Sequence, residues 1–92
     1  MKPSCLMMIQ KSCPYCQQAF RLMEELQQEN PVYKQISFQV VDELENPSFA
    51  DSLDYWYVPT YFINGKKIHE GVPTREKIRA VFEEILHIQN EE

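Results

Sequence analysis

The chain has 92 residues, enough for one domain with a modest hydrophobic core and too few for two, so we expect a single domain over residues 1–92. Apolar residues make up 43% and charged residues 25%, as in an ordinary globular protein, and the net charge of −5 argues against nucleic acid or an anionic membrane as a partner. The apolar segment before Gln10 is too short for a signal peptide, and we therefore expect a cytoplasmic protein. In a reducing cytosol, three cysteines indicate redox or metal chemistry rather than a framework of structural disulfides.

The first half of the chain predicts a strand, a helix and a second strand. Residues 5–9 form a continuous apolar run, which is typical of a short buried strand. From Cys13 to about Glu29 apolar residues recur at helical spacing, and Asn30-Pro31 ends the pattern. The apolar stripe of this helix consists of Cys16, Ala19, Phe20, Met23 and Leu26. The alternation of Ile36, Phe38 and Val40, followed by Val41, predicts the second strand.

The second half predicts a short helix, a hairpin and a final helix. Asn46-Pro47 is typical of a helix start, and the short helix would carry Phe49 and Leu53 on one face. Asn64-Gly65 between two apolar runs, 61–63 and 67–69, predicts an antiparallel hairpin. Thr74 can cap the final helix, whose apolar stripe consists of Ile78, Val81, Phe82, Ile85 and Leu86. The predicted order is therefore β-α-β-α-β-β-α.

Cys13-Pro14-Tyr15-Cys16 lies where the first predicted strand passes into the first helix. Pro14 suits the first helical position, which makes Cys13 the N-cap and places Cys16 within the first turn. The unpaired N–H groups and the positive end of the helix dipole favour negative charge on the Cys13 sulfur. We therefore expect Cys13 to be the attacking thiolate and Cys16 the thiol that resolves the mixed disulfide.

The element order and three motifs make the chain resemble the thioredoxin fold, and more closely the glutaredoxin family. The motifs are Cys13-Pro14-Tyr15-Cys16, the segment Val58-Pro59-Thr60 that leads into the third strand, and Gly71 before the last helix. The resemblance extends over nearly the whole chain. It implies an α/β fold with a four-stranded mixed sheet flanked by three helices, a cis peptide bond before Pro59, and a thiol–disulfide oxidoreductase that reduces protein or mixed disulfides.

The predicted site combines this resemblance with the properties of single residues. Because Pro59 has no N–H to donate to a sheet, the backbone of Val58 can bond an extended thiol substrate. Tyr15 matches the family residue that lies beside the reactive sulfur and lines the substrate groove. The site comprises the catalytic Cys13 and Cys16, the substrate-binding Lys11, Tyr15, Val58, Pro59 and Gly71, and the supporting Pro14 and Thr60, with no metal ligand.

The chain departs from the glutaredoxin pattern at the positions that would bind glutathione. Gln10 stands where the family has a basic residue, and the lysine is one place later, at Lys11. The usual glycine pair before the last helix is Glu70-Gly71, and Pro73 and Thr74 follow. Pro73 removes a potential N–H donor, and Glu70 adds negative charge beside an anionic tripeptide. We therefore expect dithiol exchange with weak glutathione binding, so that glutathione is only a candidate co-substrate.

The predicted partners are disulfide-containing proteins, with glutathione or a flavin-dependent thioredoxin reductase as electron donor. The protein would act as a monomer without a bound cofactor. The alternative is a non-catalytic metal or iron–sulfur carrier that uses the same cysteines, which visible absorbance of the purified protein would reveal. Zinc needs about four ligands, whereas the rest of the chain offers only Cys5, His69 and His87 without paired spacing. We expect Cys5 to be a small buried hydrophobe and Tyr55-Trp56-Tyr57 to pack at a helix end.

Overall fold

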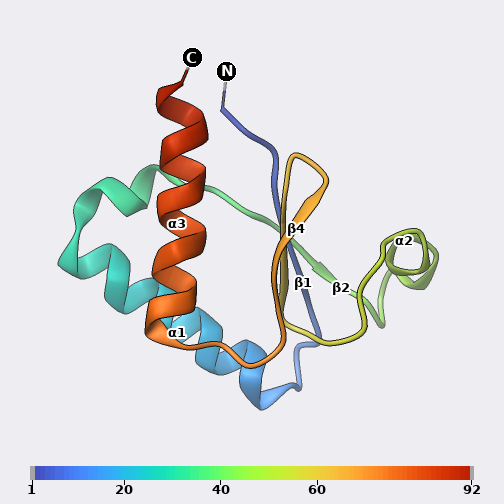
Figure 1. Cartoon of the computed structure of the whole chain (residues 1–92). Coiled ribbons are helices and arrows are strands. Elements are labelled where there is room, and N and C mark those ends of the chain that lie inside the picture. The colour runs from blue at the N-terminus through green and yellow to red at the C-terminus, as the bar shows by residue number, and fades with distance from the viewer. Residues whose placement is uncertain (1, 92) are drawn as a thin grey trace.

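One mixed sheet of four strands forms the centre of the structure, a computed structural model that describes residues 2–91 (Figure 1). The elements in chain order are β1 (Cys5–Ile9), α1 (Pro14–Glu29), the short 3-10 helix η1 (Pro31–Gln35), β2 (Gln39–Asp42), α2 (Pro47–Asp51), β3 (Thr60–Ile63), β4 (Lys66–Glu70) and α3 (Arg75–Asn90). The predicted order of strands and α-helices is confirmed, and η1 is an addition that the sequence pattern did not predict.

The strand order in the sheet is β2-β1-β3-β4. β1 pairs in parallel with β2, whereas β3 pairs antiparallel with both β1 and β4. The parallel pair needs a long crossover connection, and α1 supplies it. The β3–β4 hairpin turns at Asn64 and Gly65, both with positive φ, as the Asn-Gly pair predicts. The fold is the expected thioredoxin fold.

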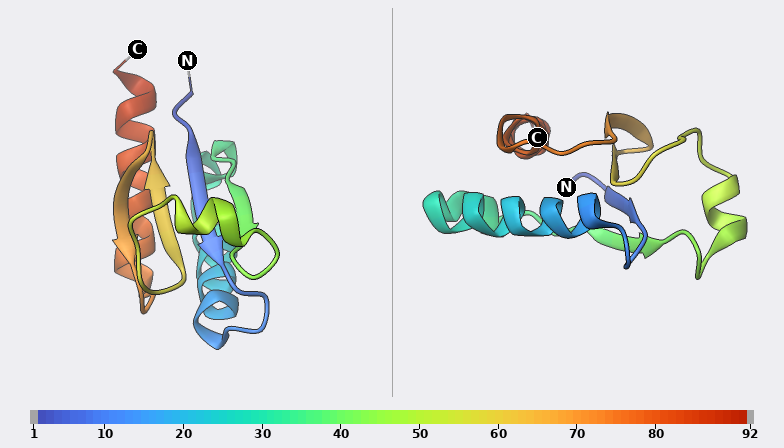
Figure 2. Two further views of the ribbon diagram at one scale, coloured as in Figure 1. Left: turned by 90° about the vertical axis from the view of Figure 1, so that its right-hand side faces the viewer. Right: turned by 90° about the horizontal axis from the view of Figure 1, so that it is seen from below.

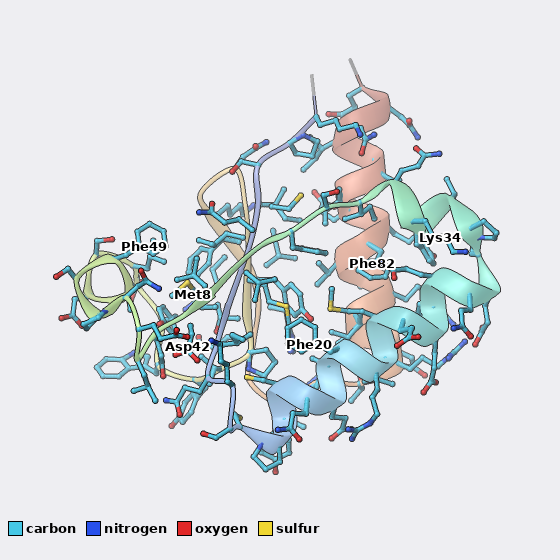
Figure 3. All side chains as sticks on the ribbon, turned by 180° about the vertical axis from the view of Figure 1, so that it is seen from behind. Met8, Phe20, Lys34, Asp42, Phe49 and Phe82 are labelled. Carbon is cyan, nitrogen blue, oxygen red and sulfur yellow. The ribbon has the colours of Figure 1, made fainter. Side chains whose placement is uncertain are left out.

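The helices cover both faces of the sheet (Figure 2). α1 and α3 lie on one face, and α2 lies on the other. Along β1, side chains alternate between the faces: Met7 belongs to the core beneath α1 and α3, whereas the equally buried Met8 lies outside that cluster. Figure 3 shows Phe82 on α3 within the larger core and Phe49 on α2 at the opposite side. Most of the hydrophobic core therefore lies on the face that α1 and α3 cover.

The long helices begin where the sequence predicts. Pro14 occupies the first turn of α1, with Cys13 as the N-cap. At the start of α3, the Thr74 hydroxyl accepts the N–H of Lys77 at 3.1 Å. Each helix buries one apolar stripe against the sheet, as the helical spacing predicts. Among residues 2–91, no helix is both long and apolar enough to cross a membrane.

The second strand begins three residues later than predicted. Asn30 ends α1, and its side chain accepts the N–H of Val32 at 3.3 Å, so the chain turns into η1 instead of extending. Tyr33 enters the core from η1, and its hydroxyl donates to Glu83 at 2.6 Å. Ile36 is buried as the C-cap of η1 rather than as a strand residue. The alternating pattern therefore combined a buried residue outside the sheet, Ile36, with a strand residue that is 45% exposed, Val40.

Two predicted apolar helix faces were also wrong in part. Phe20 is 37% exposed, because Ala19 and Met23 take the core-facing positions of α1. In α2, which ends at Asp51, no residue is buried, and Leu53 lies beyond the helix. A five-residue helix offers too short a stripe to bury both Phe49 and Leu53.

Candidate active site

The two motif cysteines lie at the junction of β1 and α1 with different exposure. Cys13 is partly exposed, whereas Cys16, one helical turn further, is only 1% exposed. The Cys13 N–H donates to Gln10 O at 3.0 Å, and the N–H of Gln17 donates to Cys13 O at 3.1 Å. These bonds between near neighbours form the turn that opens the helix. Both thiols are free, so the pair is in its dithiol form.

The buried thiol holds its proton firmly. The pKa of Cys16 is raised from 9.0 to about 12, chiefly by burial. The Cys13 side chain and the Glu43 carboxylate add to this rise, whereas a hydrogen bond from the Gln10 backbone acts in the opposite direction. Tyr55 donates to Glu43 Oε1 at 2.6 Å, and the Gln10 side chain donates to the other carboxylate oxygen. An accessible thiol therefore stands next to a thiol that stays protonated until it reacts.

A second wall of the site comes from the chain before β3. The Val58–Pro59 peptide bond is cis, as the resemblance implies. The N–H of Gly71 donates to Pro59 O at 2.9 Å, and Gly71 has a φ of 93°, which favours glycine. Together with Tyr15 of α1, these segments enclose a shallow apolar groove of about 290 Å³. The residues that line the groove are Tyr15, Tyr57, Val58, Gly71 and Val72.

Two side chains hold the segment before Pro59. The Glu70 carboxylate accepts the N–H groups of Trp56 and Tyr57, the latter at 2.9 Å, and it also pairs with Lys67 at 2.8 Å. The Thr60 hydroxyl donates to the carbonyl of Tyr57. The Lys67 ammonium, followed by the two backbone N–H groups, lowers the pKa of Glu70 to about 2, so its carboxylate is charged at neutral pH.

Lys11 does not lie in the groove, although it was predicted to bind substrate. Its ammonium pairs with the Glu45 carboxylate at 2.7 Å on the exposed surface. Its backbone N–H donates to Asp42 Oδ2 at 2.9 Å, and Asp42 also accepts the N–H of Leu44 at 2.8 Å. Asp42 thereby joins the end of β2 to the loop before Cys13 (Figure 3).

The structure brings three of the predicted site residues, Tyr15, Val58 and Gly71, together around the groove and adds others that the sequence analysis missed. Tyr57 and Val72 complete the apolar walls, although Tyr57 was expected only to pack at a helix end. The motif Val58-Pro59, which directly follows Tyr57, is the sequence signal that could have indicated Tyr57 as a groove residue. Glu70 was interpreted as a repulsive charge, whereas its carboxylate in fact binds the loop. The β3–β4 register, shifted by an irregularity between Tyr61 and Phe62, is what brings Glu70 next to that loop.

The remaining cysteine and histidines do not form a cluster with the motif. Cys5 is buried in β1, as expected. His69 contacts the carbonyl of Gly71 at 3.2 Å, and burial lowers the pKa of its ring. His87 pairs with Glu91 at the end of α3. Within residues 2–91, no group of three or more His, Cys, Asp or Glu side chains is arranged to hold a metal ion.

A dithiol at the start of a helix, with Tyr15 between the two cysteines lining an apolar groove beside a cis-proline loop, defines a thioredoxin-fold protein of the thiol–disulfide exchange class. Residues 6–83 match the thioredoxin-domain family, and the chain belongs to that family. Membership of this family implies thiol–disulfide oxidoreductase activity.

Similar proteins carry thioredoxin or disulfide oxidoreductase names. The chain is 35% identical to a thioredoxin of Methanocaldococcus jannaschii over 66 residues, which cover 72% of this chain and 75% of that protein. It is 33% identical to a protein disulfide oxidoreductase from Aeropyrum pernix, with a TM-score of 0.59. That match covers 94% of this chain but only 38% of the other one. A thioredoxin of Malassezia sympodialis shares the fold, with 23% identity, a TM-score of 0.67, and coverage of 91% of this chain and 75% of that chain.

Proposed function

We propose that this protein reduces disulfides in other proteins through the Cys13 and Cys16 dithiol, acting as a monomer. The observation that carries the proposal is the apolar groove in which Tyr15, two residues after the accessible Cys13, lies together with Val58. Among residues 2–91, no backbone hydrogen bond engages the N–H or C=O of Val58. An extended substrate strand can therefore pair with Val58 while its disulfide reaches Cys13.

The reaction proceeds in two exchange steps. The Cys13 thiolate attacks one sulfur of the substrate disulfide, a Cys13–substrate disulfide forms, and the other substrate sulfur leaves as a thiolate that takes up a proton. Cys16 then loses its proton and attacks the Cys13 sulfur, which releases the second substrate sulfur as a thiol. The substrate gains two electrons and two protons, and the protein is left with a Cys13–Cys16 disulfide. A thiol or dithiol reductant must then restore the pair.

The high pKa of Cys16 fits the second role in this sequence. A thiol that remains protonated at neutral pH does not compete with Cys13 for the first substrate. Once the mixed disulfide has formed, the two sulfurs are held one helical turn apart, so the second attack is intramolecular. Burial of Cys16 thus gives the two thiols different roles: Cys13 attacks the substrate, and Cys16 resolves the mixed disulfide.

Trapping experiments test the assignment of the two cysteines. We expect Cys16→Ser to accumulate mixed disulfides on Cys13, because the resolving attack is lost, and Cys13→Ser to accumulate none. Mass spectrometry after reaction with a disulfide-bonded protein, such as oxidised insulin, measures both. Wild-type rates of insulin reduction in both variants would contradict the dithiol mechanism.

We further propose that the protein is a glutaredoxin-like reductase that uses glutathione poorly. Lys11 is paired with Glu45, Pro73 offers no N–H, and the Thr74 side chain already accepts the N–H of Lys77. These contacts leave few donors for the carboxylates of glutathione near the groove. A flavin-dependent thioredoxin reductase is then the preferred electron donor, and glutathione is a secondary one.

Parallel assays with the two reductants test this choice. We expect insulin reduction to be sustained by a thioredoxin reductase with NADPH, and glutathione with glutathione reductase to sustain it at least about tenfold less well, as the loss of one charge-assisted contact predicts. Saturation at low glutathione would contradict this proposal and favour an ordinary glutaredoxin.

A further inference from the structure

Glu70 binds the part of the chain that forms one wall of the groove. The β3–β4 register places Glu70 opposite Thr60, the first residue of β3. From there its carboxylate reaches back to the N–H groups of Trp56 and Tyr57. The side chains of these aromatic residues are 84% and 69% exposed, so side-chain packing does little to fix this segment. The backbone is instead held through its polar groups.

The carboxylate divides its two oxygens between two tasks. Oε1 receives the Lys67 ammonium at 2.8 Å, and Oε2 receives both backbone N–H groups. Glu70 is only 19% exposed, so water competes weakly for these contacts. Hydrogen bonds to a charged acceptor are among the stronger ones in proteins. Lys67 keeps the carboxylate ionised and oriented, and the carboxylate orients the loop.

The loop that Glu70 holds is the one on which a substrate would dock. Tyr57 and Val58 line the groove, and Val58 follows directly after the second N–H that Glu70 binds. From the other side of the loop, Thr60 binds the carbonyl of Tyr57. Tyr57, the residue that precedes Val58, is therefore held at both its N–H and its C=O, which orients the Val58 backbone before any substrate arrives.

We propose that Glu70 is a positioning residue that pre-orders residues 56–58 for extended peptide substrates and contributes little to the exchange chemistry itself. This inference rests on the proposed function, because it concerns how that substrate docks. Pre-ordering lowers the entropic cost of binding a strand. A small disulfide that needs no backbone pairing gains nothing from it. Glu70 therefore determines a preference for peptide disulfides over small ones.

The test compares two probes in single turnovers of fully reduced protein. One probe is a short extended peptide closed by an intramolecular disulfide, and the other is 2-hydroxyethyl disulfide. Either probe is reduced to two thiols while the Cys13–Cys16 pair is oxidised, so no further reductant is needed. We expect Glu70→Ala to slow the peptide reaction about tenfold, the effect of losing roughly one charge-assisted contact. The reaction with 2-hydroxyethyl disulfide should stay within about twofold of wild type, as for an ordinary surface substitution.

Three further variants separate positioning from charge and from folding. Glu70→Gln keeps an oxygen acceptor without the charge, so its rate with the peptide probe should lie between those of wild type and Glu70→Ala. Lys67→Gln removes the ion pair but keeps the carboxylate, so it should slow the peptide reaction less than Glu70→Ala does. Glu84→Ala, on the exposed side of α3, makes the same change in net charge and should leave both reactions unchanged.

Fluorescence reports on the loop independently of the reaction. Trp56 is the only tryptophan in the chain, so its anisotropy follows the mobility of this segment directly. We expect Glu70→Ala to lower that anisotropy. Unchanged anisotropy, or an equal slowing of both probes, would overturn the positioning role. A wild-type protein that reduces neither probe would overturn the proposed function instead, while the anisotropy would still test the contact between Glu70 and the loop.

Discussion

The two walls of the candidate site are held in different ways. The wall at the start of α1 is held by bonds between near neighbours, from Cys13 to Gln10 and from Gln17 to Cys13. The wall formed by residues 56–58 is held by Glu70, which lies more than ten residues further along the chain. The comparison teaches that the cysteine geometry is encoded locally, whereas the groove opposite depends on sheet register.

The walls also differ in their access to water. Cys16 lies under the first turn of α1 within the main core, whereas Trp56 and Tyr57 extend into solvent. Burial raises the pKa of the thiol, and ion pairing lowers the pKa of the carboxylate that holds the loop. Alkali and acid should therefore disturb the two walls separately.

The largest expected effect is a loss of folding stability when the glycine next to the groove, Gly71, is replaced. Gly71 has a φ of 93° and Gly65 a φ of 81°, and no heavy atom beyond the adjoining residues lies within 4 Å of a Cβ built on either. Alanine at either position should therefore lower the free energy of unfolding through backbone strain alone, by about 1–2 kcal/mol. Urea denaturation measures this loss.

The two glycine variants form a matched pair for function. Gly71 donates its N–H to Pro59 O, whereas Gly65 lies in the hairpin turn between β3 and β4. Gly71→Ala should also slow reduction of the peptide disulfide, because strain at Gly71 shifts the wall at Pro59. Gly65→Ala should lose stability without this change. Equal activity in the two variants would show that the groove tolerates movement at Gly71.

A smaller effect should appear in alkali, at the wall that carries Cys16. Its thiol ionises near 9.0 in the unfolded chain but only at about 12 in the fold. Between these values the unfolded state loses a proton that the folded state keeps, so the free energy of unfolding falls as pH rises. Buried Tyr61, whose pKa is also raised, contributes in the same range. Urea titrations at several pH values should show a shallower decline for Cys16→Ala than for wild type, and identical slopes would contradict the prediction.

The smallest effect should appear in acid, at the loop wall. The pKa of Glu70 falls from 4.5 to about 2 on folding, chiefly because of Lys67, which also lies near Asp54. The stabilisation from Glu70 is therefore complete above about pH 4.5 and is lost as pH falls towards 2. The stability advantage of wild type over Glu70→Gln should shrink in that window, with a parallel change in Trp56 fluorescence. A constant difference across the window would contradict the prediction.

Much of the fold was predictable because its signals are local. The Asn64-Gly65 turn, the Thr74 cap and Pro14 at the helix start each have one low-energy geometry, and all three occur as expected. The second strand was misplaced because burial of Ile36 by η1 gives the same apolar pattern as burial in a sheet. Phe20 was misplaced because the apolar stripe of α1 is a little wider than the part of the helix that contacts the core. Phe20 lies at the edge of that stripe and is left partly exposed.

The sequence by itself determined the order of elements and the pair of cysteines at a helix start, because both depend on residues within a few positions of one another. Only the tertiary structure decided that Lys11 pairs with Glu45 away from the groove and that Tyr57 and Val72 line it. The same holds for Glu70, whose partners depend on which β4 residue lies opposite Thr60. The Asn64-Gly65 turn sets the pairing next to it, but an irregularity between Tyr61 and Phe62 shifts the register by one residue, so that Glu70 rather than His69 lies opposite Thr60.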